Sequence, residues 1–166
     1  MSVSFISVEP ELRVLDREVR DRLLELLGLD ESDVDSRFPV QESFAGNWHP
    51  IVVLADRELF HQFRFSPADV ATIMRERGWT GTVTVLNAIG PLAFEARNLF
   101  PVGRITEDPA TGSAAAATGA YLRAHGFSGQ TIHIRQGRHV GRPSELHATI
   151  PDRGGIGVAG TATRIG

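Results

Sequence analysis

The residues best suited to chemistry gather in one short segment, residues 107–113, which reads EDPATGS and leads into a predicted helix. Acids, hydroxyls and a glycine therefore meet at a helix N-terminus, where unpaired N–H groups and the helix dipole favour a carboxylate or another anion. Gly112 lets a ligand approach the backbone, and Thr111 and Ser113 can cap the helix or donate to that ligand. The segment predicts an anion site, although Asp108 or Thr111 acting only as an N-cap would explain the same residue types.

Two absences narrow the chemistry further. The chain contains no cysteine, which excludes disulfides, zinc–thiolate sites and thiol catalysis. All 17 basic residues are arginine, so no lysine can form a Schiff base with pyridoxal phosphate or a carbonyl substrate. The sequence also lacks a glycine-rich phosphate loop and a Ser-His-Asp elbow. The chain therefore cannot use covalent catalysis through a cysteine thiol or a lysine amine.

The helix that follows the segment is unusual in its side chains. Residues 112–125 read GSAAAATGAYLRAH, with no large or charged side chain among the first nine. A surface helix would show a polar face, so this one is predicted to be buried, with a curved sheet around it. The alternative is that an alanine-rich segment is simply a good helix former.

The remaining pattern is rich in strands with short connections. Such links are too short for parallel crossovers, which predicts an α+β fold with a mainly antiparallel, barrel-like sheet wrapped around the central helix. Strands are expected over 2–9, 37–45, 50–55, 81–88, 92–100, 130–136, 144–150 and 156–165, and further helices over 16–27 and 67–77.

Length and composition fit a single domain over residues 1–166. A net charge of −3 without a basic tail argues against nucleic-acid binding, and no apolar run is long enough for a membrane span. Residues 1–9 lack the basic start and apolar core of a signal peptide, so a cytoplasmic location is expected.

Two segments together resemble the PhzF family of phenazine-biosynthesis proteins. They are EDPATGSAAAATGAYL, residues 107–122, and RQGRHVGRPSEL, residues 135–146. The stretch RNLFP at residues 97–101 fits the same family, and the resemblance covers essentially the whole chain as the C-terminal half of such a protein. It implies half of a diaminopimelate epimerase-like fold, in which two similar halves each wrap a sheet around a helix and enclose the active site between them.

The resemblance also implies a reaction and a set of roles. The best-known member isomerises a dihydro-hydroxyanthranilic acid by moving a proton, without metal or organic cofactor, whereas relatives with paired cysteines racemise or epimerise amino acids. By this likeness Asp108 is the active-site aspartate that positions the substrate or its proton, and Ser113 is the serine at the helix start. Thr111 and Gly112 fit the cradle for the substrate carboxylate. Gln136, with Gly141 and Arg142, is expected to be mainly structural.

The histidines show no pair at metal-binding helical spacing and no adjacent carboxylate motif, so no metal site is predicted. They are His49, His61, His125, His133, His139 and His147. Of these, His139 lies in the second family segment and is a candidate to face the substrate cleft.

One departure from the family leaves three interpretations open. The family's general base is a glutamate of the N-terminal half, near a G-N-P motif, and no N-terminal half is found in this chain. Residues 46–50, GNWHP, resemble that motif only superficially and receive no role. The chain could be half of a split isomerase with a separate N-terminal half as partner. It could pair with a second copy of itself, or bind a small carboxylate without converting it.

Overall fold

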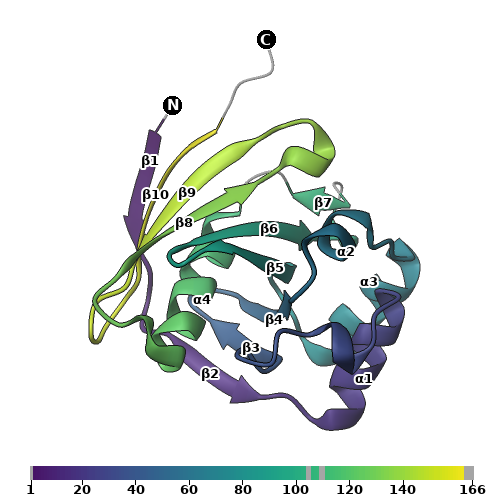
Figure 1. Cartoon of the computed structure of the whole chain (residues 1–166). Coiled ribbons are helices and arrows are strands. Elements are labelled where there is room, and N and C mark those ends of the chain that lie inside the picture. The colour runs from purple at the N-terminus through teal and green to yellow at the C-terminus, as the bar shows by residue number, and fades with distance from the viewer. Residues whose placement is uncertain (1, 104–105, 109–110, 163–166) are drawn as a thin grey trace.

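The computed structural model describes residues 2–103, 106–108 and 111–162 (Figure 1). Pro109 and Ala110 of the acidic segment, and the end of the strand predicted over 156–165, lie outside the described residues. In the described part, the chain forms a ten-stranded sheet, one helix enclosed by that sheet, and three α-helices against its other face.

The strands follow the order β1-β10-β9-β8-β6-β5-β4-β3-β2, and the short β7 pairs with β6. Their bounds are β1 (Ser2–Ile6), β2 (Glu11–Val14), β3 (Gln41–Phe44), β4 (Trp48–Leu54), β5 (Val83–Gly90), β6 (Ala93–Leu99), β7 (Glu107–Asp108), β8 (Thr131–Gln136), β9 (Ser144–Thr149) and β10 (Gly157–Ala162). Only the pairs β4–β5 and β6–β8 are parallel among the described strands. The predicted α+β class with a mainly antiparallel sheet is confirmed.

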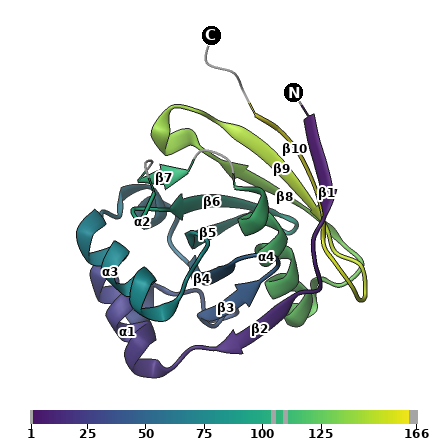
Figure 2. The same cartoon turned by 180° about the vertical axis from the view of Figure 1, so that it is seen from behind.

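The sheet must curl, because its two edge strands are close neighbours in the sequence. β1 and β2 stand at opposite ends of the strand order, yet only residues 7–10 connect them. A chain extends by at most about 3.5 Å per residue, so this link reaches less than about 20 Å. The two edges are therefore brought together, and the sheet forms a half-barrel (Figures 1 and 2).

The helix inside the half-barrel is α4 (Gly112–Leu122), whose residues from Ala114 to Leu122 are all buried. Its small side chains let the strands approach closely: a Cβ at Gly119 would lie only 2.7 Å from Cγ2 of Ile156. From the opposite side, the hydroxyl of Ser43 donates to the carbonyl oxygen of Ala117 over 2.7 Å. The predicted buried central helix is confirmed, although it ends at Leu122 rather than residue 125.

The two faces of the sheet support two separate apolar cores. On β4, Ile51 and Val53 pack toward α4, whereas Val52 and Leu54 belong to the outer core, as alternation along a strand requires. The outer core is covered by α1 (Arg17–Leu26), α2 (Arg57–Gln62) and α3 (Pro67–Arg77). Three further short helical segments are η1 (Glu31–Asp33), η2 (Arg123–Phe127) and η3 (Arg138–Val140).

Two strands and one α-helix lie outside the predicted strands and helices. They are β2, the two-residue strand β7, and α2. β2 has only four residues, all of them exposed, and α2 has only six, so each segment is too short to give a clear sequence pattern. Within the ranges that the structure describes, no helix has the length and apolar character needed to cross a bilayer.

Candidate functional site

Ser113, in the first turn of α4, hydrogen-bonds to a histidine of β4. Its Oγ lies 3.1 Å from Nε2 of His49. The imidazole of His49 is completely buried, and its Nδ1 lies 2.9 Å from the carbonyl oxygen of Thr82. Gly81 leaves space for this ring, because a Cβ at that position would overlap it. A tightly packed imidazole therefore holds the hydroxyl of Ser113.

The proton positions on His49 follow from its partners. A carbonyl oxygen only accepts, so Nδ1 carries the proton that is donated to Thr82. Burial lowers the pKa of His49 to about 4, against a smaller opposing effect of the bond to Thr82. The ring is then neutral near neutral pH, and Nε2 is an acceptor. The hydroxyl of Ser113 must donate to it, which leaves the lone pairs of its oxygen to accept a proton or a hydrogen bond from a ligand.

A buried polar network continues beneath the imidazole. The hydroxyls of Thr82 and Thr84 donate to Oδ1 of Asn98 over 2.7 and 2.8 Å. Asn98 stands opposite Asp108 in the antiparallel pairing of β6 with β7. The network thus leads from His49 to the strand that carries Asp108.

Asp108 is held at the start of α4 by two buried residues. The hydroxyl of Thr111 donates to Oδ2 of Asp108 over 2.7 Å. Nε2 of Gln136 lies 2.8 Å from the carbonyl oxygen of Asp108 and 3.0 Å from Oγ1 of Thr111. Oε1 of Gln136 also accepts from the amide of Thr111 over 3.3 Å. These bonds orient the carboxylate of Asp108 relative to the helix.

The first turn of α4 has the features of an anion site. The side chain of Thr111 makes no capping bond, since it is turned toward Asp108, and the first turn contains no acidic residue. A Cβ at Gly112 would lie 3.0 Å from Cε1 of Phe5, which forms one wall beside the helix start. The structure therefore brings Asp108, Thr111, Gly112 and Ser113 together.

His139, the remaining candidate from the sequence, lies in η3 within an adjoining cluster. Its Nε2 is 3.0 Å from Nδ1 of His61, and its Nδ1 is 3.9 Å from Oε2 of Glu107. Glu107 pairs with Arg97 over 3.0 Å, and both side chains are buried. Burial, followed by the nearby positive charge of Arg97, lowers the pKa of His139 to about 4.

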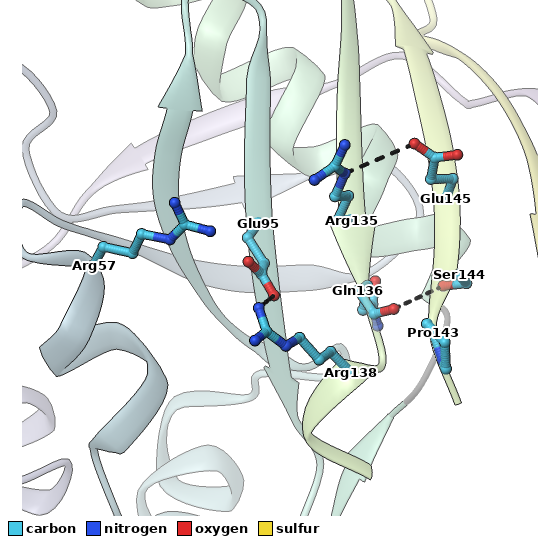
Figure 3. A pocket seen from close by; sticks show the side chains of 8 residues that line it. All are labelled: Arg57, Glu95, Arg135, Gln136, Arg138, Pro143, Ser144 and Glu145. Carbon is cyan, nitrogen blue, oxygen red and sulfur yellow. Dashed lines mark hydrogen bonds and ion pairs between the residues drawn. The ribbon is translucent and has the colours of Figure 1, made fainter. Parts of the chain in front are cut away.

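A pocket of about 410 Å³ lies beside Gln136 (Figure 3). It is lined by Arg57, Glu95, Arg135, Gln136, Arg138, Pro143, Ser144 and Glu145. Arg138 lies 4.0 Å from Glu95 and Arg135 lies 3.9 Å from Glu145, so the charges partly compensate one another. Gln136 is shared between this pocket and the hydrogen bonds at the start of α4.

Sequence reasoning missed His49, which partners Ser113 from 64 residues away. The sequence prediction treats residues 46–50 as a turn, whereas the bend covers residues 45–47 and His49 already belongs to β4. A histidine inside the otherwise apolar run WHPIVVL is the signal that could have found it. His61 and Glu95 were missed as well, because their nearness to His139 arises only in the fold.

Comparisons with known proteins agree with this architecture. A family model described as phenazine biosynthesis-like protein matches residues 8–165. An uncharacterized isomerase of Deinococcus radiodurans is 30% identical over 147 residues, which cover 86% of this chain and 47% of that protein. The uncharacterized isomerase YddE of Salmonella typhimurium is 27% identical over 141 residues, which cover 82% of this chain and 48% of that protein. The chain thus spans about half the length of these curated relatives.

Solved structures show the same fold. A predicted epimerase from Pseudomonas aeruginosa superposes with a TM-score of 0.80 at 23% identity, covering 98% of this chain and 57% of that one. A phenazine biosynthesis protein of the PhzF family from Bacillus anthracis gives a TM-score of 0.77 at 18% identity, covering 99% of this chain and 59% of that one. In each case the match takes in almost all of this chain and little more than half of the solved one.

Proposed function

Because the chain belongs to the phenazine biosynthesis-like protein family, we propose that it takes part in isomerisation by relocating a proton on a small cyclic or amino-acid-like carboxylate. The reaction would need no metal ion or organic cofactor, since the chain itself supplies proton donors and acceptors around the start of α4. The observation that carries this proposal is the meeting of the Ser113–His49 pair and the Asp108–Thr111 pair at one helix N-terminus.

The substrate carboxylate would bind to the first-turn amides of α4. These amides carry the positive end of the helix dipole, and an anion in that position is stabilised by both effects. Gly112 offers no side chain that would keep a carboxylate away, and the ring of Phe5 covers one side. Partial shielding from water strengthens such an interaction.

Ser113 and Asp108 would act on the rest of the substrate. The oxygen of Ser113 accepts a hydrogen bond from a substrate N–H or O–H, because its own proton is committed to His49. Asp108, oriented by Thr111, would position or relay the migrating proton. The group that first removes this proton would come from outside the chain, as the likeness to the family implies.

We therefore propose that residues 1–166 correspond to the C-terminal half of a PhzF-like protein and need a second half for turnover. One candidate is a separate N-terminal-half polypeptide. The other is a second copy of the chain, because a fold with two similar halves can be imitated by a symmetric dimer. Light scattering on the purified chain, alone and with a candidate N-terminal half, distinguishes the two.

Proton exchange from deuterated water into a panel of small amino and cyclic carboxylates tests the reaction itself. We expect exchange by the assembled protein, and a loss of at least about 100-fold in Asp108→Asn, the lower range for a missing proton-transfer group. Ser113→Ala should also slow the exchange, because it removes a hydrogen-bond acceptor for the substrate. Matched controls are Asp152→Asn and Ser128→Ala, which make the same changes in a hydrogen-bonded pair of exposed residues. Full activity of Asp108→Asn would refute the assignment. Carboxylate binding without exchange would favour the non-catalytic alternative.

A further inference from the structure

Two histidines and a glutamate from three separate elements converge outside the proposed catalytic site. They are His61 of α2, Glu95 of β6 and His139 of η3, and one ligand atom from each lies within 4.8 Å of the others. Nδ1 of His61 is 3.0 Å from Nε2 of His139, and Nε2 of His61 is 3.7 Å from Oε1 of Glu95. We propose that these three residues bind a divalent transition-metal ion of the zinc type.

The ligand set and its spacing suit such an ion. Zinc is commonly held by imidazole nitrogens and a carboxylate oxygen at about 2.0–2.2 Å, so two nitrogens on a tetrahedral ion lie about 3.3 Å apart. Nδ1 of His61 and Nε2 of His139 are 3.0 Å apart and share a hydrogen bond, so a bound ion would replace the shared proton, and the two rings would turn until both lone pairs face the ion. Glu95 is nearly buried, so its carboxylate stays near the two rings. Three protein ligands leave a fourth position for water.

The second ring nitrogen of His139 supports the assignment independently. Its Nδ1 is buried and has no hydrogen-bond partner among the described residues, although Oε2 of Glu107 lies 3.9 Å away. A histidine that binds a metal through one nitrogen usually donates its other N–H to a carboxylate or carbonyl. Metal binding at Nε2 would place a proton on Nδ1, facing Glu107, and a small rotation would complete that bond.

The surrounding charges allow a cation to enter. The positive charge of Arg97 is offset by its ion pair with Glu107. The side chain of Arg138 is 64% exposed, so Arg138 can leave Glu95 and move into solvent. A pocket lined by His61, Gln62, Phe63, Arg64, Arg97 and His139 leads to the two imidazoles. Arg64 at this entrance is unpaired among the described residues, and its positive charge opposes a divalent ion, so we expect moderate rather than extreme affinity.

The bound ion would join α2, β6 and η3. η3 begins two residues after Gln136, which braces Asp108, so the ion would stiffen the support of Asp108 without touching the substrate. The proposal stands apart from the isomerase assignment, because none of its ligands belongs to the start of α4.

Metal titration of the purified chain without a histidine tag tests the site. Zinc chloride is followed by calorimetry, and cobalt(II) by its visible absorption, which reports the ligand set. We expect one equivalent to bind, with affinity reduced at least about tenfold in His61→Gln, His139→Gln and Glu95→Gln, the lower bound for loss of even an outer-sphere partner. Zinc should also raise the thermal midpoint of the wild type more than that of these variants.

His133→Gln is the matched control. His133 and His147 face each other across β8 and β9 with ring centroids 4.4 Å apart, and His133 is exposed, so this pair is the obvious competing site. Zinc binding that is unchanged in His133→Gln and weakened in His61→Gln supports the proposal. Zinc binding that is weakened only in His133→Gln, or that is absent in the wild type, overturns it. If one variant misfolds by circular dichroism, the other two ligand variants decide.

Discussion

Lowering the pH should destabilise the fold through His49. Burial keeps its pKa at about 4, below the ordinary value of 6.5, so between these values the unfolded chain binds a proton that the folded chain does not. The stability that the neutral buried ring provides is therefore complete above about pH 6.5 and is lost progressively as the pH falls toward about 4. The linkage relation gives a loss of about 2 kcal/mol from this residue between about pH 7.5 and pH 5.

The substitution His49→Gln should remove this part of the pH dependence. Glutamine can still donate to the carbonyl oxygen of Thr82 and accept from Ser113, but it does not titrate. Urea unfolding at both pH values measures the free energy of unfolding for each protein. With a slope of about 2 kcal/mol per molar urea, the wild-type midpoint should fall about 1 M further than that of the variant. The pKa values of His125 and His139 are also lowered by burial, but both residues are present in both proteins and cancel in the comparison.

His133→Gln, which changes an exposed histidine in the same way, serves as the control and should follow the wild type. An equal loss in wild type and His49→Gln would contradict the reasoning, because it would mean that His49 is already protonated or solvated in the folded protein. It would also remove the basis for treating the hydroxyl of Ser113 as a donor to the ring.

Three further substitutions probe what holds the site in place, each measured by urea unfolding. Glu107→Gln leaves the buried guanidinium of Arg97 without its counter-charge and should cost about 2–4 kcal/mol, and an unchanged midpoint would contradict burial of the pair. Ser43→Ala removes a buried bond to the backbone of α4 and should cost about 1 kcal/mol, whereas a gain would show the hydroxyl is dispensable. Gly119→Val forces side-chain atoms against Ile156 and should cost about 1–3 kcal/mol, and wild-type stability would show that α4 can shift.

The sequence predicts the fold correctly where the local residue pattern reflects how the element packs in the structure. The nine small residues at the start of segment 112–125 predict a helix that other backbone can approach closely, and Gly119 against Ile156 is such an approach. The helix predicted to reach residue 125 ends at Leu122, because the chain continues as η2, with non-helical backbone angles at His125 and Gly126.

The sequence does not predict which distant strands pair with one another. The prediction of one strand over residues 2–9 places the whole N-terminal segment at one edge of the sheet, but the chain leaves β1 at Ile6 and enters β2 at Glu11 on the opposite edge. Short links exclude parallel crossovers only between the strands that they join, and two of the links are long. The parallel pair β4–β5 is connected through α2 and α3, and the pair β6–β8 through α4.

In the candidate site, too, local contacts are predicted from the sequence and long-range contacts are not. Asp108 and Thr111 are three residues apart, so a local motif was enough to bring them together. The bond between Ser113 and His49 joins α4 to β4, and the parallel register of β4 and β5 holds the same imidazole beside Thr82. No spacing in the sequence encodes that register.

The hydrogen bonds at the start of α4 also bear on what a second half would contribute. β4 supplies the imidazole that holds Ser113, β7 carries Asp108 beside β6, and β8 supplies Gln136 to brace it. All of these contacts lie within this chain, so we expect the isolated chain to bind a small carboxylate at the helix start. A second half would then be needed for turnover, because it would bring the general base and exclude water, rather than for building the binding site. Carboxylate binding that appears only in the assembled protein would contradict this division of roles.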